Sequence, residues 1–453
     1  MVVALALIVG WASYVSFRDG ELGLVDTSVL TTYLFAIFAI HLLFVLAGRR
    51  TDEFLFPATA MLGGISLLMM QRLPQDLIVQ SLAGRELGLG QLQLVWILLG
   101  FALLAVTATV VRSDGWLRRY KYTWAALGIG LLLLVFVLGE VTGGARLSLT
   151  IGPFSGQPSE LLKVILVVFL AGYLAENRAL LAQSSTRVGP LRLPPLPYLA
   201  PMLAMWGIAL AIVIVQRDLG AALLYFLLFL GLLYVATRRV SYVVIGLVLF
   251  LAGAVVLYQL FPHVQDRVDI WIDPFADPQG AGYQILRAMF AYGRGGILGT
   301  GLGAGLPQVG EVPSIPAIHT DFIFAAMAEE MGMLGALGIL GLYVLIAQRG
   351  FRIAAQAADD FRALLATGLT LVIVIQAAII MGGNLRVVPL TGITLPLVSY
   401  GGSSLLVNGA VIGLLLALSD RGVEPPPPSA TRSVYQRLGR RARGFASKVE
   451  SAV

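Results

Sequence analysis

The chain has 453 residues, of which 58% are hydrophobic and 12% are charged. Soluble domains carry about twice that share of charge, and the mean hydropathy here is +0.87, so a soluble enzyme is excluded. There is no cysteine, which excludes disulfide-rich scaffolds and thiolate metal sites. The composition leaves a polytopic membrane protein, with 31 basic and 25 acidic residues and a net charge of +6.

Twelve stretches are long and apolar enough to cross a bilayer, since about 20 mostly apolar residues span a core of about 30 Å. They lie at 2–17, 28–48, 54–71, 90–111, 123–140, 158–176, 199–215, 219–237, 241–261, 320–348, 362–382 and 394–418. Runs such as Leu131–Leu138 do not alternate as membrane β-strands do. We therefore expect an all-α polytopic protein with about 12 transmembrane helices. The first stretch is read as a span, because no basic residue precedes it as in a signal peptide.

Basic residues predict the orientation of these spans. With both termini in the cytoplasm, 21 of the 31 Lys and Arg residues fall in cytoplasmic segments, and the tail from Arg421 to Lys448 supplies 7 of them. The opposite orientation would invert this ratio. We predict a multi-pass protein of the cytoplasmic membrane with both ends inside, whose basic tail can contact anionic lipids.

One outer segment is much longer than the other connections. Residues 262–319 separate spans nine and ten, and a loop of this length is usually functional. Its stretch Tyr283–Tyr292 has apolar residues at helical spacing, which predicts a helix in the membrane interface. The run Gly299–Gly305 is interpreted as a flexible loop, because no strand precedes it as in a nucleotide-binding site.

Charged residues at membrane depth cost a few kcal/mol unless they are paired or hydrated. Glu160 and Lys163 begin span six three residues apart, so they share one helix face and can pair. A helix-start ion pair without function is an equal alternative. Arg217 and Asp218 separate spans seven and eight, where a salt-bridged turn is the simpler interpretation.

Span ten combines acidic residues with a row of glycines. Glu329 and Glu330 lie about ten residues inside it, where a buried structural network explains them as well as catalysis does. Glycines recur at every third position from Gly332 to Gly341, which predicts close packing on a neighbouring helix.

Motifs of soluble chemistry are missing from the sequence. It has no Gly-x-x-x-x-Gly-Lys-Ser/Thr phosphate loop, and its three histidines are too scattered to suggest a metal site. Topology accounts for the basic residues, so we expect no nucleic-acid partner.

Several segments, taken in order, resemble the SEDS family (shape, elongation, division and sporulation), the peptidoglycan polymerases that include RodA and FtsW. The matching stretches are Gly144–Arg146, Gln157–Lys163, Asp277–Gln284, His319–Glu330 and Pro396–Ser404. The match covers about residues 54–420, and the run Gly295–Gly301 with the two extra spans favours RodA over FtsW. Two positions depart from the family pattern: Arg217 stands where a proline is usual, and Leu147 follows Arg146 where a second arginine is common.

Members of the family usually have ten spans. The resemblance therefore implies two added N-terminal helices at 1–53 and a membrane core at 54–420 that carries the catalytic loop 262–319. Residues 421–453 would form a Pro-rich linker and a basic cytoplasmic tail.

The resemblance implies a glycosyltransferase that polymerises lipid II at the outer face of the cytoplasmic membrane during elongation. An FtsW-like division polymerase is the alternative, and a lipid II flippase or a non-catalytic scaffold are alternatives of another class. The resemblance also implies that Asp277 is the catalytic base, because Pro-x-Gly-x-Gly-Tyr follows this aspartate and not its neighbour Asp273. Without the family, a turn-capping role for Asp277 is equally plausible. The substrate-binding residues it implies are Arg146, Glu160, Lys163, Arg217, Asp218, His319, Asp321, Glu330, Ser399 and Ser403.

Partners and cofactors follow from the same resemblance. The chain has no transpeptidase domain, so a single-pass class B penicillin-binding protein of the elongation or division machinery would crosslink the product. Carboxylates and pyrophosphate both bind Mg²⁺ or Mn²⁺, so a divalent cation is compatible with this chemistry, although no ligand set can be named.

Overall fold

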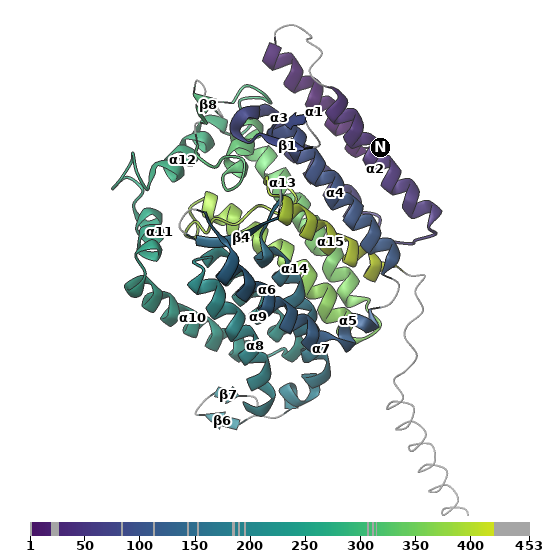
Figure 1. The fold of residues 1–453 in the computed structure, drawn as a ribbon, viewed down its shortest axis with the longest axis vertical. Coiled ribbons are helices and arrows are strands. Elements are labelled where there is room, and N and C mark those ends of the chain that lie inside the picture. Colours follow the sequence, from purple (N-terminus) through teal and green to yellow (C-terminus); the bar gives the residue numbers. More distant parts are fainter. Residues whose placement is uncertain are drawn as a thin grey trace, which may run out of the picture. The chain divides into compact units, whose positions relative to one another are not determined.

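Helices make up most of the chain (Figure 1). The structure, a computed structural model, describes residues 2–19, 27–82, 85–111, 114–142, 145–151, 154–183, 186–188, 191–193, 196–305, 308–309, 312–313 and 315–420. The helices are α1 (Val2–Asp19), α2 (Thr27–Leu46), α3 (Leu55–Arg72), η1 (Gln75–Leu77), α4 (Leu89–Val110), α5 (Gly115–Arg119), α6 (Lys121–Leu138), α7 (Pro158–Gln183), α8 (Leu196–Val215), α9 (Leu219–Thr237), α10 (Val240–Leu260), α11 (Pro262–Ile272), α12 (Tyr283–Gly295), α13 (Ile323–Ala355), α14 (Asp360–Asn384) and α15 (Gly402–Ser419).

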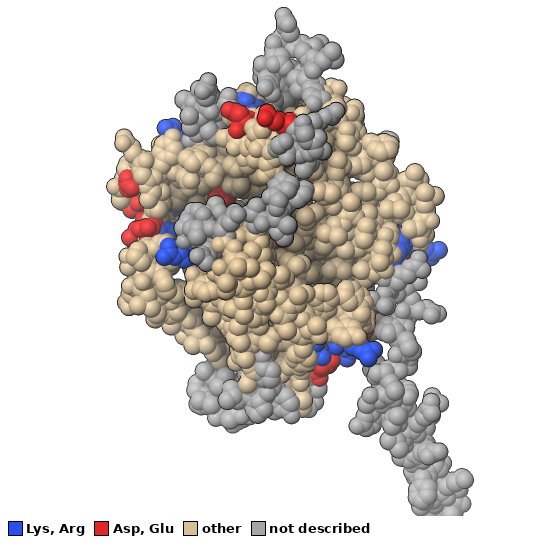
Figure 2. Space-filling model, in the orientation of Figure 1, with Lys and Arg blue, Asp and Glu red and all other residues tan. Residues whose placement is uncertain are grey.

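Each of the twelve expected spans overlaps one of these helices. Within the described ranges, nine helices are long and apolar enough to cross a membrane, and Val2–Ala12 and Met202–Val215 are shorter apolar helices. Lys, Arg, Asp and Glu side chains on the face in Figure 2 gather toward the helix ends and leave a broad uncharged surface between them. The chain is an all-α, multi-pass membrane protein, while the count of twelve spans stays a prediction.

Local sequence explains where several helices begin. The Asp218 carboxylate caps α9 by accepting a hydrogen bond of 3.0 Å from the Ala221 amide. Asp359 caps α14 in the same way, accepting a hydrogen bond of 2.9 Å from the amide of Arg362. Pro158 is the first residue of α7, where its missing N–H would have no partner in any case.

The N-terminal helices pack on the first helices of the core. In Figure 1, α1 and α2 run beside α3 and α4. The buried Tyr33 hydroxyl of α2 donates to the Ala60 carbonyl of α3 at 2.5 Å, and the Leu7 side chain of α1 lies against Gly64. These contacts make α1 and α2 an integral part of the packed bundle.

Two spans differ from their predicted form. The backbone of α13 breaks at Gly332 (φ 68°, ψ −172°). Among the described residues nothing lies within 4 Å of a Cβ placed at Gly338 or Gly341, so the predicted close packing is wrong at these two glycines. Span twelve begins at Gly402 and not near residue 394. Pro396 disfavours a helix through residues 394–401 because it lacks an N–H and restricts the residue before it.

The Gly299–Gly305 run is held at the break in α13, so its interpretation as a flexible loop is wrong. Amides at 300–301 donate to the carbonyls at 329–330, each at 3.0 Å. Amides at 333–334 donate to the carbonyls at 296–297, at 2.9 and 3.2 Å. Helix ends leave backbone groups without partners, and residues 296–301 supply partners for both ends of the interrupted helix.

Short antiparallel hairpins, which the sequence analysis did not predict, connect several helices. Their strands are β1 (Gln80–Leu82) with β2 (Arg85–Leu87), β3 (Glu140–Thr142) with β4 (Ala145–Ile151) and β5 (Phe154–Gly156), β6 (Thr186–Val188) with β7 (Leu191–Leu193), and β8 (Gln308–Val309) with β9 (Val312–Pro313). The long segment between α10 and α13 holds α11 and α12. Helix α12 confirms the predicted amphipathic helix, and it packs on α13 and buries Ile285, Leu286 and Ala288.

Candidate active site

A buried lysine lies at the centre of the candidate active site. The Lys163 side chain, on the second turn of α7, is 1% exposed and its Nζ lies 2.5 Å from Glu160 Oε2. The same ammonium donates to Gln376 Oε1 at 2.8 Å and to Asn408 Oδ1 at 3.2 Å. A buried charge needs such partners to offset its lost hydration. The predicted pairing of Glu160 with Lys163 is confirmed, and their roles stay predictions.

The non-helical segment before α15 extends this network. Gln376 Nε2 donates to the Thr394 carbonyl at 2.9 Å, and the Thr394 and Ser404 hydroxyls lie 2.7 Å apart. Ser403 Oγ accepts a hydrogen bond of 3.0 Å from the Gln157 amide, just before α7. The start of α7 and the start of α15, far apart in sequence, therefore meet at one place.

The start of α9 joins the same place through Asp218. Its carboxyl group is hydrogen-bonded to the Ser159 hydroxyl and lies near Glu160. Burial raises the pKa of Asp218, the Ala221 amide opposes this change, and the negative charge of Glu160 adds to it. Arg217 has a φ of 63°, a conformation that is uncommon outside glycine and that often marks functional turns.

Residues 319–321 lie against the segment that precedes α15. The Ser399 hydroxyl donates to the Thr320 carbonyl at 2.5 Å, and the Tyr400 amide donates to the His319 carbonyl at 2.8 Å. The Asn384 side chain donates to the Asp321 carbonyl at 2.8 Å. His319, Asp321 and Ser399, predicted separately from sequence, thus belong to one neighbourhood.

Arg267 of α11 is a candidate site residue that sequence analysis missed. Its Nη1 donates to the Leu390 carbonyl at 3.2 Å, and its positive charge faces Asp321 and Asp218. Burial lowers the pKa of Arg267, and the two acidic residues oppose that shift. Burial also raises the pKa of Asp321 to about 6, against the effect of Arg267. The available sequence signal was its place among the few basic residues outside the cytoplasmic segments.

Asp277 lies on the exposed turn between α11 and α12. Its two carboxylate oxygens accept hydrogen bonds from the amides of Gly280, at 3.0 Å, and Ala281, at 2.8 Å. A Cβ at position 280 would overlap that carboxylate, so any larger residue there would displace the Asp277 side chain. The turn-capping geometry is present, and it fixes the direction of an exposed carboxylate. The catalytic role of Asp277 stays a prediction.

Glu330 belongs to a second cluster. Its Oε1 lies 3.3 Å from Arg72 Nε of α3, and its Oε2 accepts a hydrogen bond of 2.9 Å from the Gly303 amide of the glycine-rich loop. Its neighbour Glu329 pairs with Arg294 of α12 at 2.8 Å. These contacts form the structural network that the sequence allowed as an alternative, and a substrate-binding role for Glu330 stays a prediction.

Arg146 and the divalent cation complete the predicted set. Arg146 lies in β4 opposite Val141, and its side chain is outside the described part of the chain. Within the described ranges, no group of three or more His, Asp or Glu residues is placed to hold a metal ion. Glu160 is paired with Lys163, and Asp218 and Asp321 face Arg267. The divalent cation stays a prediction.

Comparison with known sequences gives consistent relatives. A family model described as a cell cycle protein, named for FtsW, RodA and SpoVE, matches residues 52–422. The peptidoglycan glycosyltransferase RodA of Mycobacterium tuberculosis (strain ATCC 25618 / H37Rv) is 40% identical over 404 residues, which cover 87% of this chain and 84% of the relative. A protein of Thiomicrospira cyclica named "Probable peptidoglycan glycosyltransferase FtsW" is 38% identical over 320 residues, 70% of this chain and 78% of that protein.

Solved structures share the fold. A chain from a peptidoglycan synthase complex, described as coordinating polymerization and crosslinking, aligns with a TM-score of 0.64 and 28% identity over 82% of this chain and 98% of its own length. The Thermus thermophilus rod shape determining protein RodA aligns with a TM-score of 0.57 and 24% identity over 83% of this chain and 99% of its own length. At that identity the second comparison speaks for the fold alone.

Proposed function

Because the chain belongs to the family of FtsW, RodA and SpoVE, we propose that it is a peptidoglycan glycosyltransferase that polymerises lipid II at the outer face of the cytoplasmic membrane. The observation that carries this proposal is the meeting of Glu160 and Lys163 with Asp218, Arg267 and Asp321 in a protein 40% identical to a RodA glycosyltransferase. The RodA relative covers more of the chain than the FtsW relative, which favours a role in elongation and cell shape.

The reaction joins two lipid-linked sugars. A hydroxyl of the acceptor attacks the anomeric carbon of the donor, a C–O bond forms, and the bond from that carbon to undecaprenyl pyrophosphate breaks. A carboxylate within hydrogen-bond reach of the attacking hydroxyl can take its proton. We assign that proton to Asp277, whose carboxylate is exposed on the turn and oriented by two backbone amides.

The leaving pyrophosphate carries the charge that develops as the bond breaks. Positioned cations stabilise such charge most strongly in a site that excludes water. Arg267 faces Asp218 and Asp321, Lys163 is paired with Glu160, and Arg217 directly precedes Asp218 at the start of α9. In this proposal these groups, with Arg146, hold the pyrophosphate, and Ser399, Ser403, Asp218, His319 and Asp321 orient the lipid-linked sugars. Glu330, in its separate cluster with Arg72, is proposed as a further substrate-binding residue.

A lipid-linked substrate explains the location of this chemistry. The isoprenoid chain stays in the bilayer, so the reacting sugars must lie at its surface, where α11 and α12 leave the bundle (Figure 1). The distribution of basic residues supports placing both termini in the cytoplasm and this surface outside. The energy for polymerisation comes from the pyrophosphate bond of the donor. No step requires a metal, although a divalent cation bound with the pyrophosphate is compatible with it.

Crosslinking of the product needs a second enzyme. We assign it to a single-pass class B penicillin-binding protein of the elongation machinery, because a structural relative comes from a complex that coordinates polymerization and crosslinking.

Purified protein incubated with lipid II in detergent tests the proposal. We expect glycan chains to appear on a gel without any other protein. A flippase moves lipid II without covalent change and a scaffold has no reaction of its own, so the absence of polymer from folded protein would reject the glycosyltransferase assignment.

A further inference from the structure

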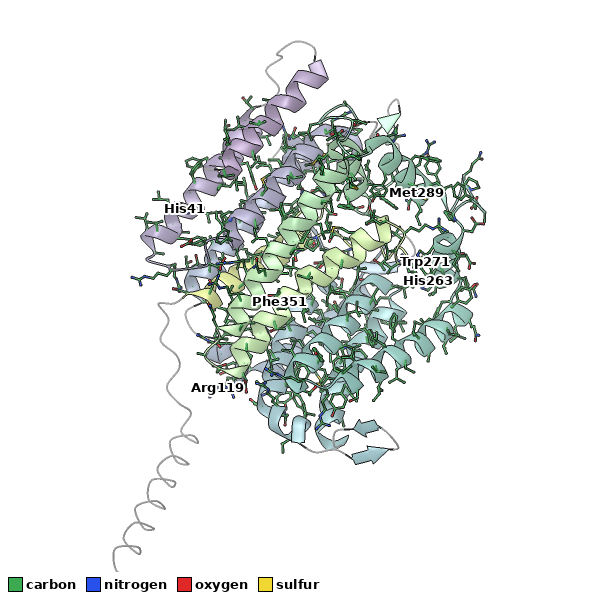
Figure 3. The ribbon with its side chains drawn as sticks, turned by 180° about the vertical axis from the view of Figure 1, so that it is seen from behind. His41, Arg119, His263, Trp271, Met289 and Phe351 are labelled. Carbon is green, nitrogen blue, oxygen red and sulfur yellow. The ribbon has the colours of Figure 1, made fainter. Side chains whose placement is uncertain are left out.

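The C-terminal end of α11 is tied to the residues that follow α14. Arg386 Nε donates to the Trp271 carbonyl at 2.7 Å, and Arg386 Nη2 donates to the Ile272 carbonyl at 2.5 Å. The Trp271 indole N–H returns a hydrogen bond of 3.0 Å to the Arg386 carbonyl. We call Arg386 and Trp271 the clamp. In Figure 3, Trp271 and His263 of α11 lie on the same edge of the molecule as Met289 of α12.

The chemistry of a helix end explains why an arginine suits this position. The carbonyls of Trp271 and Ile272 are among the last four of α11, which have no partner within the helix. A positive side chain is favoured at this negative end of the helix dipole. A guanidinium presents its donors in a rigid planar fork, so one side chain fixes two carbonyls at once.

The backbone of Arg386 points to the same conclusion. Its φ is 60°, a conformation that glycine adopts without cost and other residues rarely adopt. Such strain persists where the surroundings hold it, and it is often found at functional positions. The position therefore combines an unfavourable backbone with a side chain that makes specific contacts.

The clamp lies at the entrance to the turn that carries Asp277. Helix α11 ends at Ile272, and Asp277 follows five residues later. A hollow of about 560 Å³, lined by Trp271, Ile272, Met289, Leu385 and Arg386, lies between the C-terminal end of α11, the middle of α12 and the residues that follow α14. Both clamp residues line this hollow and are hydrogen-bonded directly to each other, so the clamp fixes the end of α11 beside a space that side chains do not fill.

We propose that Arg386 is a positioning residue, which holds the end of α11 and thereby sets the position of the Asp277 carboxylate. This inference rests on the proposed function for its effect on catalysis, but its effect on the turn can be measured separately. Arg386 acts through the backbone of α11 and touches neither the substrate nor the proton that Asp277 accepts.

Arg386→Gly tests the clamp without adding strain, because glycine accepts a φ of 60°. Misplacing a reacting group by about 1 Å can lower a rate about 100-fold, so we expect kcat for glycan formation to fall roughly 10- to 100-fold with KM unchanged. Arg386→Lys keeps the charge but loses the fork, and it should fall between Arg386→Gly and the unchanged protein. Arg238→Gly is the matched control. Arg238 also has a positive φ, 55°, but it lies at the C-terminal end of α9, whereas Asp218 lies at the N-terminal end.

A spin label on Ala276→Cys provides a readout that does not depend on activity. The chain has no cysteine, so the label reports the exposed turn next to Asp277 alone. We expect Arg386→Gly to increase the mobility of this label, and Arg238→Gly to leave both mobility and kcat unchanged. Unchanged mobility in Arg386→Gly, or increased mobility with unchanged kcat, would overturn the inference. Absence of glycan from the unchanged protein would instead reject the proposed function and leave the mobility result standing.

Discussion

The pair formed by Glu160 and Lys163 offers a test that separates a structural role from a functional one. We consider two near-isosteric changes, Glu160→Gln and Lys163→Met, alone and together. Breaking a buried ion pair by removing one partner costs about 3–5 kcal/mol, because the remaining charge is left without compensation. Replacing both charged groups is often nearly neutral.

The structure predicts that the two single changes differ. The Lys163 side chain is 1% exposed, whereas that of Glu160 is 12% exposed. Without Glu160, the ammonium keeps only neutral acceptors such as Gln376 and Asn408 and has almost no access to water. Glu160→Gln should therefore lose stability near the upper end of about 3–5 kcal/mol, and Lys163→Met near the lower end.

Thermal denaturation in detergent, with glycan formation from lipid II measured on the same samples, distinguishes the roles. We expect both single variants to denature at lower temperature and to form no glycan. The double variant should regain most of the stability and still form no glycan. A double variant that is both stable and active would show that the pair is purely structural. Single variants as stable as the unchanged protein would refute the reasoning from burial.

Four further outcomes are expected. Burial raises the pKa of Asp321 to about 6 from its ordinary value of 3.8. Glycan formation should therefore fall as pH drops through about 6, because Arg267 loses a charged partner. This fall in activity at low pH should be absent from Asp321→Asn, and its persistence in that variant would contradict the assignment. Stability changes in the opposite sense, because a raised carboxyl pKa favours the folded state at low pH and that contribution is lost between 3.8 and about 6 as pH rises. Gly280→Ala should displace the carboxylate of the turn and lower kcat by roughly 10-fold or more, and unchanged kinetics would show that the turn geometry does not matter. Ser314→Cys should react with an impermeant thiol reagent in intact cells and Ser429→Cys should not, both positions being outside the described residues; the reverse pattern would invert the orientation.

Much of the architecture could be predicted because it follows from local rules. Runs of apolar residues predicted where the helices of the bundle lie, since each has to match the thickness of a bilayer. The pairing of Glu160 with Lys163 followed from a spacing of three residues on one helix face. The helix after Asp277 followed from the period of its apolar residues.

The features that were missed depend on contacts between distant parts of the chain. The break at Gly332 is stable because backbone groups at 296–301 form hydrogen bonds with both helix ends. No local sequence pattern predicts these hydrogen bonds. Arg267 could be assigned only after folding had brought α11 over Asp218 and Asp321. The start of α15 was misplaced because Thr394–Gly401 is apolar enough for a span, although Pro396 and the positive φ of Leu397, 66°, keep it out of the helix.

The central claim, that Asp277 accepts the proton from the attacking hydroxyl, is tested most directly by Asp277→Asn measured beside Asp273→Asn. Both aspartates are exposed and precede proline in the same turn, and Asp273 accepts one backbone amide hydrogen bond where Asp277 accepts two, so Asp273 is a close control. We expect Asp277→Asn to bind lipid II and form no glycan, because the amide keeps the shape but cannot accept the proton. Asp273→Asn should retain substantial activity. Glycan from Asp277→Asn, or an equal loss in both variants, would contradict the account.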